Sequence, residues 1–285
     1  MSTTFQEARE KFINFLKANK RATATILAYG KDIEQLITFL TALGREELPK
    51  ATKEDLEAFL KSLQKNSYTL KSISRKLNSL KTFYRFLKES NLISDDPSLT
   101  IAHPKYEVKP PRILSRMEYR ALRDACRDDI RISAVVELLL QTGIRIGELA
   151  NLQLEDIKND ELFVRAYESH AARNVPLNKA AKQALEKYLT VRPKTQSKTL
   201  FVTKTGRPLL IRNIRTAIDR YFRLSGVRDA KVNDLRHTFI AQHLMANTPL
   251  TIISKLVGHK RLSTTEKYLD IIKDRSAETV RLEEL

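Results

Sequence analysis

The stretch Leu256-Val-Gly-His-Lys-Arg-Leu-Ser-Thr-Thr-Glu-Lys-Tyr268 carries the clearest local signals for the fold of this 285-residue chain. Gly258 is the residue type that most often ends a helix, and Ser263, or the threonine after it, can cap the helix that follows. His259 then lies in the turn between the two helices, and Tyr268 lies about one turn into the second. The sequence therefore predicts a tight helix–turn–helix unit. A lone tyrosine at such a position is usually a half-buried core residue.

A second segment, Thr142-Gly-Ile-Arg-Ile-Gly-Glu-Leu149, combines a helix-ending glycine with two charged residues. Arg145 follows this glycine between two apolar residues, and Glu148 comes one helical turn later. An arginine fixed at a buried helix end presents a rigid fork, which suits bidentate contact with a phosphate. The alternative is a structural ion pair between Arg145 and Glu148, and this segment by itself favours the ion pair.

A third segment, Val232-Asn-Asp-Leu-Arg-His-Thr-Phe239, is predicted to be helical. Asn233 is followed by Arg236 three residues later and by His237 four residues later, so these side chains share one helix face. Apolar residues alternate with them along the segment. Taken alone, the pattern is also typical of an ordinary amphipathic helix.

The rest of the C-terminal part is predicted to be mostly helical with one small sheet. Ser115 and Glu118 have the spacing of a capping box at the start of a helix. The period changes to that of strands over residues 161–167 and 173–177, which are joined by a turn, and residues 200–202 are a candidate third strand. Further helices are expected at residues 146–152, 178–189, 211–224, 233–246, 250–257, 263–273 and 276–284.

The N-terminal third is predicted to be entirely helical, and prolines separate it from the rest. Apolar residues recur at helical spacing, and Thr52 with Asp55 resembles a capping box. The pattern stops where four closely spaced prolines forbid a continuous helix. We therefore expect a helical domain over residues 1–96, a linker over residues 97–111 and a second domain over residues 112–285.

The charge of the chain points to a polyanionic partner. There are 51 Lys and Arg residues against 34 Asp and Glu residues, a formal net charge of +17 at pH 7. Residues 58–88 and 187–218 contain eight basic residues each and no acidic residue. A solvated helix normally mixes the two signs, so these stretches are expected to be two surfaces that face one nucleic acid. The alternative is a charge surplus that only favours solubility.

The composition excludes several other classes of protein. With 42% hydrophobic residues, 7 glycines and 9 prolines, the chain is neither disordered nor collagen-like. The one cysteine, Cys126, cannot form an internal disulfide, and no Cys/His cluster has the spacing of a zinc site. No apolar stretch is long enough to span a bilayer. These features favour a cytoplasmic protein.

The strings TGIRIGEL, DLRHTF and VGHKRLSTTEKYL, with a predicted two-stranded hairpin after the first, resemble the tyrosine recombinase, or phage integrase, family. The segment SYTLKSISRKLNSLKTFYRFLKESNLISDDP resembles the DNA-binding N-terminal domain of that family, and the length is closest to its simple Xer-type members. The resemblance covers essentially the whole chain. It implies a mainly α-helical fold with a small antiparallel β-sheet, in which a helical core-binding domain and a catalytic domain form a C-shaped clamp on DNA.

The resemblance also implies a mechanism. Tyr268 would attack a DNA phosphate, which forms a 3′-phosphotyrosyl link and frees a 5′-hydroxyl. Arg145 and Arg236 would donate hydrogen bonds to the phosphate, and His259 would donate another or help to position the tyrosine. The phenol needs help in losing its proton, because its pKa lies near about 10. One phosphodiester is exchanged for another, so neither a metal ion nor a cofactor is expected.

Two positions depart from the family pattern. The family usually has a histidine three residues before the second arginine, where this chain has Asn233, which can donate a hydrogen bond but cannot carry a proton near neutrality. The family also usually places a lysine in the hairpin turn as the acid for the leaving 5′ oxygen. Alignment puts Glu168 near that position, and His170 or Arg173 are the alternatives. Cleavage is therefore expected to be slow, conditional or abolished.

Three functions are compatible with these features. The leading one is a site-specific recombinase; the others are a sequence-specific DNA-binding protein that no longer cleaves, and a topoisomerase with the same chemistry. The expected partners are duplex DNA and further copies of the chain, four on two DNA sites, in association with the nucleoid. The amphipathic segment Ser276–Leu285 is expected to pack on a neighbouring protomer or on its own domain. The residues expected to contact DNA are Arg75, Lys76, Lys81, Arg173, Lys204, Arg207 and Arg212.

Overall fold

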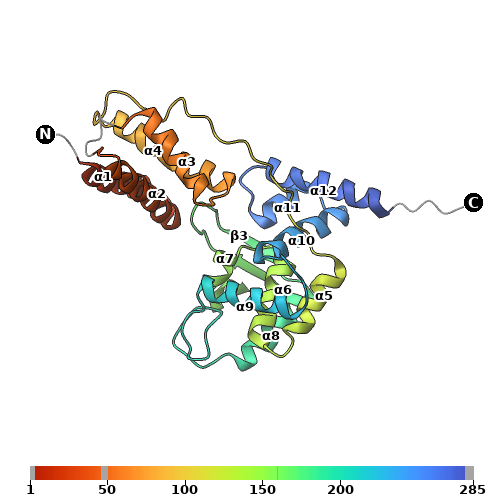
Figure 1. The fold of residues 1–285 in the computed structure, drawn as a ribbon. Helices are drawn as coiled ribbons and strands as arrows, with labels where there is room; N and C mark the ends of the chain where they lie inside the picture. Colours follow the sequence, from red (N-terminus) through yellow and green to blue (C-terminus); the bar gives the residue numbers. More distant parts are fainter. Residues whose placement is uncertain (1–3, 46–50, 159, 280–285) are drawn as a thin grey trace, which may run out of the picture. The chain divides into compact units, whose positions relative to one another are not determined.

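The structure, a computed structural model, describes residues 4–45, 51–158 and 160–279, with side chains described as far as residue 273. Contacts within the chain divide it into two units, Met1–Val108 and Lys109–Leu285. Both units are mainly helical, and the strands of the described residues form a small antiparallel sheet in the second unit (Figure 1). The predicted fold class, mainly α-helical with a small antiparallel sheet, is confirmed.

The described part of the N-terminal unit is a set of helices around an aromatic core. The capping box predicted at Thr52 is confirmed, because its hydroxyl accepts a hydrogen bond from the Asp55 N–H and its own N–H donates to the Asp55 carboxylate. In the core, the rings of Phe12 and Phe83 meet edge to face with centroids 5.2 Å apart. The helices are α1 (Phe5–Ala18), α2 (Thr23–Ala42), α3 (Lys53–Lys65) and α4 (Leu70–Glu89).

Part of the predicted linker packs against this unit. Ile101 is buried in the core of the helices, and the hydroxyl of Ser74 is hydrogen-bonded to Nδ1 of His103 at 3.1 Å. Residues 97–111 contain no helix, which follows from their prolines. The boundary between the two units falls after Val108, near the end of the stretch that was expected to be a linker.

The C-terminal unit begins with the second predicted capping box. The Ser115 hydroxyl accepts a hydrogen bond from the Glu118 N–H at 3.2 Å, and the Glu118 carboxylate accepts one from the Ser115 N–H at 2.8 Å. The following buried helix, α6, packs against α8 and α10 and forms the centre of the core. The helices are α5 (Arg116–Ala125), α6 (Ile130–Thr142), α7 (Ile146–Ala150), α8 (Lys179–Val191), α9 (Ile211–Leu224), α10 (Val232–Met245), α11 (Leu250–Val257) and α12 (Ser263–Thr279), with a 3₁₀ turn η2 (Leu154–Asp156).

A three-stranded antiparallel sheet follows α7 and precedes α8 in the sequence. Its order is β1 (Ile157–Lys158), β2 (Glu161–Val164) and β3 (Arg173–Pro176). Leu162 pairs with Val175, and both side chains are buried. The predicted hairpin between β2 and β3 is present. Its turn is the one in which the family usually places a lysine.

The prediction of a strand over residues 200–202 is wrong, because tertiary contacts hold this segment in another way. The hydroxyl of Tyr188 donates a hydrogen bond to the Leu200 carbonyl at 3.2 Å and accepts one from the Val202 N–H at 3.1 Å. Val202 pairs with Pro208 only as an isolated bridge, and proline has no N–H with which to extend a ladder. The third strand of the sheet is β1.

Helix α12 carries Tyr268 and packs against α10 and α11. It is one helix, whereas two pieces were predicted over residues 263–273 and 276–284; no glycine or proline interrupts the chain between them. Most of Ser276–Leu285 lies outside the described residues, so its expected packing partner is not addressed. In the described part of the chain, no helix combines the length and apolar character needed to cross a membrane.

Candidate active site

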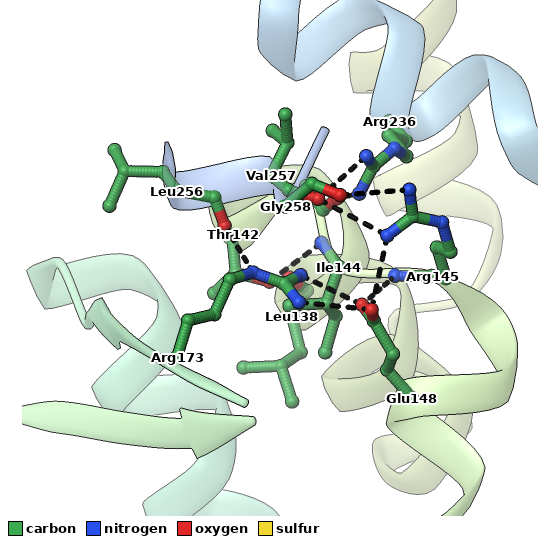
Figure 2. A network of polar contacts seen from close by, with 11 residues as sticks. Leu138, Thr142, Ile144, Arg145, Glu148, Arg173, Arg236, Leu256, Val257 and Gly258 are labelled. Carbon is green, nitrogen blue, oxygen red and sulfur yellow. Dashed lines mark hydrogen bonds and ion pairs between the residues drawn. The ribbon is translucent and has the colours of Figure 1, made fainter. Parts of the chain in front are cut away.

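The two arginines singled out in the sequence converge on one stretch of main chain. Arg145, just before α7, donates hydrogen bonds to the carbonyl oxygens of Val257 and Gly258, both at 3.2 Å. Arg236, on α10, donates to the Val257 carbonyl at 2.7 Å and to the Gly143 carbonyl at 2.5 Å. Figure 2 shows both guanidinium groups facing the end of α11. The structure thus holds two rigid donors beside the turn that follows this helix.

The two helix ends at the site depend on glycine, as predicted. Gly143 and Gly258 have φ angles of +62° and +67°, in the left-handed region that favours glycine. A Cβ atom on Gly143 would lie 2.4 Å from the ring of Phe239. This close packing fixes the end of α6 and turns the Gly143 carbonyl toward Arg236.

Glu148 is the buried carboxylate that holds two arginines in place (Figure 2). It accepts hydrogen bonds from the Arg145 main-chain N–H at 2.8 Å and from the Arg145 guanidinium at 3.1 Å. It also accepts two from Arg173, at 3.0 and 2.8 Å. Burial raises the pKa of Glu148, but the hydrogen bonds from Arg173 and from the Arg145 N–H outweigh it and lower the pKa to about 2. The predicted ion pair and the predicted rigid fork are therefore both present.

Arg173, the first residue of β3, lies inside the site. Besides its two bonds to Glu148, its Nε donates to the Leu256 carbonyl at 2.6 Å. Its side chain is 10% exposed and packs against Gly258, where a Cβ atom would approach the guanidinium to 2.9 Å. Arg173 was expected to contact DNA; in the structure its guanidinium is engaged by Glu148 and by the Leu256 carbonyl.

The site carries a surplus of positive charge. Three guanidinium groups, those of Arg145, Arg173 and Arg236, surround the single carboxylate of Glu148, so 3 − 1 leaves two positive charges. Burial, and next the charge of Arg145, lowers the pKa of Arg236 to about 9, so this group stays protonated at neutral pH. A partly desolvated cluster of guanidinium groups is suited to binding a phosphate.

His259 lies in the turn after α11, as predicted, and is neutral at pH 7. Its Nδ1 is hydrogen-bonded to the hydroxyl of the fully buried Thr265 at 2.7 Å. Burial, followed by the charges of Arg236 and Arg145, lowers the pKa of His259 to about 4. When the threonine hydroxyl donates this bond, Nε2 carries the ring proton and is free to donate to an anion.

Tyr268 is 5% exposed and packs in a cluster with Phe239 and Val257. Its hydroxyl is hydrogen-bonded to Nδ1 of His237 at 2.6 Å. Burial raises the pKa of Tyr268, and the charge of Arg236 opposes this only in part, so the phenol is protonated at neutral pH. Sequence reasoning placed His237 on the face of Arg236 and gave it no role, because no local pattern links residues 31 positions apart.

Asn233 is exposed on the first turn of α10. It lines a cavity of about 450 Å³ together with His237, which confirms that the two side chains share a face. Ile146, the neighbour of Arg145, lines the same cavity. The position where the family has a histidine therefore lies beside the site, and it holds a residue that cannot take up a proton.

The turn between β2 and β3 is closed by reciprocal main-chain hydrogen bonds between Tyr167 and His170, at 3.1 and 3.0 Å. Glu168 is exposed and has a left-handed φ of +52°. His170 is half-buried, and its Nδ1 is buried without a hydrogen-bond partner among the described residues. Burial, followed by the charge of Arg145, lowers the pKa of His170, which places this ring within electrostatic reach of the arginine cluster.

The remaining residues expected to contact DNA differ in their surroundings. Lys76 is buried, and its ammonium donates to Asp32 at 2.7 Å and to Gln35 at 2.6 Å, so its assignment as a DNA contact is corrected. Arg75 also pairs with Asp32, but its side chain is 49% exposed, and Lys81 is partly exposed. In the C-terminal unit the exposed members are Lys204, Arg207 and Arg212.

Family models match both units of the chain. The model of the phage integrase family matches residues 112–275. The model of the phage integrase N-terminal SAM-like domain matches residues 10–91. Together the two matches cover well over half of the sequence.

Individual proteins are similar over nearly the full length. The tyrosine recombinase XerC of Oceanobacillus iheyensis is 32% identical over 286 residues, which span 94% of this chain and 93% of the relative. XerC of Staphylococcus epidermidis is 32% identical over 275 residues, 92% of each chain. The crystal structure of XerA recombinase is 25% identical with a TM-score of 0.55 and covers 98% of this chain and 99% of its own. A lambda integrase dimer bound to a COC′ core site shares the fold at 18% identity, with a TM-score of 0.79 over all of this chain and 80% of that one.

Proposed function

Because the chain belongs to the phage integrase family, we propose that it is a site-specific DNA recombinase that cuts and rejoins strands through a 3′-phosphotyrosyl intermediate. The observation that carries the proposal is the convergence of Arg145 and Arg236 on the Val257 carbonyl, since Tyr268 belongs to the same buried cluster as this valine. A nucleophile and two fixed cationic donors are thereby gathered in one place. Exchange of one phosphodiester for another needs no external source of energy.

In the proposed reaction the hydroxyl oxygen of Tyr268 attacks phosphorus and the 5′ oxygen leaves. A guanidinium has five N–H donors; Arg145 uses three and Arg236 uses two in hydrogen bonds of their side chains with described residues. Both arginines therefore keep donors for the non-bridging oxygens, and each contact is worth about 2.7–4 kcal/mol in the transition state if it resembles an oxyanion-hole donor. Nε2 of His259 supplies a further hydrogen bond.

We assign the proton for the leaving 5′ oxygen to His170. The His170 ring is close enough to Arg145 for the charge of this arginine to lower its pKa. By contrast, Glu168 is exposed at the tip of the turn, and Arg173 is hydrogen-bonded to Glu148. A bound phosphate would add negative charge beside this imidazole and raise its pKa, so that the ring becomes protonated and can act as an acid.

We further propose how the protein engages DNA. Residues 1–96 form a DNA-binding domain, and residues 112–285 form the catalytic domain. The side chains that contact phosphates are Arg75 and Lys81 in the first domain and the exposed Lys204, Arg207 and Arg212 in the second. Four copies assemble on two DNA sites. The protein then works in the cytoplasm, on the nucleoid that contains its substrate.

The test of this function is covalent capture. A binding site is first selected from a randomised duplex library with the Tyr268→Phe protein, and it is then prepared as a nicked suicide substrate. The wild-type chain should form a covalent protein–DNA complex on this DNA, and the Tyr268→Phe protein should bind equally well without forming one. A covalent complex that persists in the variant would remove Tyr268 as the nucleophile.

A second candidate function is a DNA-binding protein that no longer cleaves. It is favoured by Glu168, which places a negative charge in the turn where the family has a lysine. This function predicts tight binding of the selected site and no covalent complex on any nicked substrate. If the Glu168→Lys, Asn233→His double variant forms the covalent complex and the wild type does not, the wild-type site is an impaired recombinase site.

A further inference from the structure

The hydrogen bond between Tyr268 and His237 has no role in the mechanism as described so far. The hydroxyl oxygen and Nδ1 are 2.6 Å apart, and the two ring centroids are 5.8 Å apart. Both residues come from packed helices, α10 and α12, and Tyr268 is fixed among apolar side chains that include Phe239 and Ile240. The histidine is therefore in direct contact with the oxygen that forms the bond to phosphorus.

Both members of the pair are neutral at neutral pH. Burial lowers the pKa of His237; Asp234 opposes this, and the charge of Arg236 adds to it. Burial raises the pKa of Tyr268. At neutral pH the pair is a neutral phenol and a neutral imidazole. When the ring proton is on Nε2, Nδ1 accepts the hydrogen bond from the Tyr268 hydroxyl, which is the geometry from which a proton can be transferred.

The surroundings of His237 contain charges of both signs. The cavity that it lines also presents Arg215 and Asp219 of α9, together with Lys231 and Asp234 at the start of α10. His259 lies within electrostatic reach as well, and it is neutral near pH 7. An imidazolium formed here would face Asp219 and Asp234 as well as the cationic groups, so the ring has counter-charges available when it takes up a proton.

We propose that His237 is the general base for Tyr268, an inference that rests on the proposed recombinase function. Asn233, which stands where the family has its histidine, cannot accept a proton, and His237 follows it by one helical turn on the same face. On this face of α10 the side chain that can accept the proton is therefore the histidine that contacts the Tyr268 hydroxyl.

The proposed step is balanced in both directions. During cleavage the proton of the Tyr268 hydroxyl passes to Nδ1 of His237 while the tyrosine oxygen bonds to phosphorus, and the leaving 5′ oxygen takes a proton from an acid or from water. During rejoining the 5′-hydroxyl attacks phosphorus and returns its proton to that acid or to water, the phosphotyrosyl bond breaks, and Nδ1 returns its proton to the tyrosine. No oxidant, reductant or metal ion takes part.

The experiment compares two substrates that differ at one atom. One is the selected duplex with its natural 5′ oxygen at the cleaved position, and the other carries a bridging 5′ sulfur, which leaves without an acid. The variant is His237→Asn, whose side-chain oxygen can accept the tyrosine hydrogen bond but cannot take up a proton. The matched control is His243→Asn on the same helix, a half-buried histidine whose ring packs on Phe239.

We expect His237→Asn to slow covalent-complex formation by about 10²–10⁴-fold on both substrates, with unchanged DNA binding and with wild-type rates in the control. Its rate on the sulfur substrate should rise about tenfold per pH unit between pH 6 and 9, whereas the wild-type rate should be level above about pH 6.5. Full restoration of the rate by sulfur would instead make His237 the acid for the leaving group and would overturn the proposal.

Two further outcomes also decide the matter. If His237→Asn fails to fold, as judged by lost DNA binding, the pH profile of the wild type is sufficient: a rate on the sulfur substrate that climbs about tenfold per unit from pH 6 to 9 would overturn the proposal. A wild-type protein that forms covalent complex while His237→Asn matches its rate would remove this inference and leave the recombinase function standing. A wild type that never forms the complex would remove both.

Discussion

Arg173 and Glu148 are joined by two parallel hydrogen bonds, Nη1 to Oε1 at 3.0 Å and Nη2 to Oε2 at 2.8 Å. The arginine begins β3 and the glutamate lies on α7, so the pair ties the hairpin to the helix that follows Arg145. The same carboxylate also accepts hydrogen bonds from Arg145. The position of Arg145 therefore depends on one buried, ionised carboxylate, and this dependence can be measured.

Replacing that carboxylate by an amide should weaken the C-terminal unit at neutral pH. The folded pKa of Glu148 is about 2, below the ordinary value of 4.5, so ionisation stabilises the folded state above about pH 4.5 and this contribution is lost as the pH falls toward 2. The difference corresponds to about 3 kcal/mol. Glu148→Gln should lower the free energy of unfolding by about this amount at pH 7, measured by urea denaturation, and by much less at pH 3.

The control for this prediction is Glu155→Gln. Glu155 also pairs with an arginine, Arg165, but its side chain is 61% exposed. An exposed pair is worth about 0–1 kcal/mol, so this variant should unfold close to the wild type at every pH. Equal losses in the two variants, or a loss in Glu148→Gln that does not shrink on acidification, would contradict the assigned role of Glu148.

A methyl group at Gly258 should damage the site more than the fold. Gly258→Ala places alanine at a φ of +67°, which costs about 1–2 kcal/mol, and its Cβ would lie 2.9 Å from the Arg173 guanidinium. Gly226→Ala is the matched control, because its φ is +71° and nothing lies within 4 Å of a Cβ there. Both variants should lose similar stability in denaturation, and Gly258→Ala alone should also slow cleavage. Equal cleavage rates would show that Arg173 gives way without consequence.

Much of the fold could be predicted because its signals are local. Apolar spacing located the helices, and the capping boxes at Thr52 and Ser115 located two of their starts. The strand expected over residues 200–202 failed because the Tyr188 hydroxyl, a tertiary contact, binds the main chain there. Local patterns therefore predict an element where local hydrogen bonds decide it, and they fail where a distant side chain does.

In the site, too, features that depend on local sequence could be predicted, and features that depend on distant residues could not. Arg145 and Arg236 stand in short, distinctive strings that single them out in the sequence, whereas the pairing of His237 with Tyr268 arises only when α10 packs against α12. Lys76 lies in an acid-free stretch, yet its counter-ion Asp32 comes 44 residues earlier. An acid-free stretch of sequence is therefore not by itself an acid-free surface.

The affinity for DNA should depend on the exposed basic residues and not on the buried Lys76. If DNA binding involves 6–10 phosphate contacts, affinity for the selected duplex should fall about 10³–10⁵-fold between 50 and 200 mM salt. Changing Arg207 or Arg212 to glutamine should reduce the slope of log affinity against log salt by about 1. Lys76→Met should leave the slope unchanged and lower the stability of the N-terminal unit. A flat salt response in the wild type would contradict these phosphate contacts.

His170, in the turn between β2 and β3, is the residue assigned to protonate the leaving 5′ oxygen. His170→Gln should slow covalent-complex formation on the natural substrate by about 10²–10⁴-fold, because the imidazole is the assigned acid, and it should regain the wild-type rate on the bridging-sulfur substrate. The exposed Glu168 serves as the control: Glu168→Gln should keep or raise the rate, since it removes a negative charge near the phosphate. This pattern is the opposite of that expected for His237→Asn, which sulfur should not rescue. If His170→Gln cleaves the natural substrate at the wild-type rate, the leaving group takes its proton from water or from another residue.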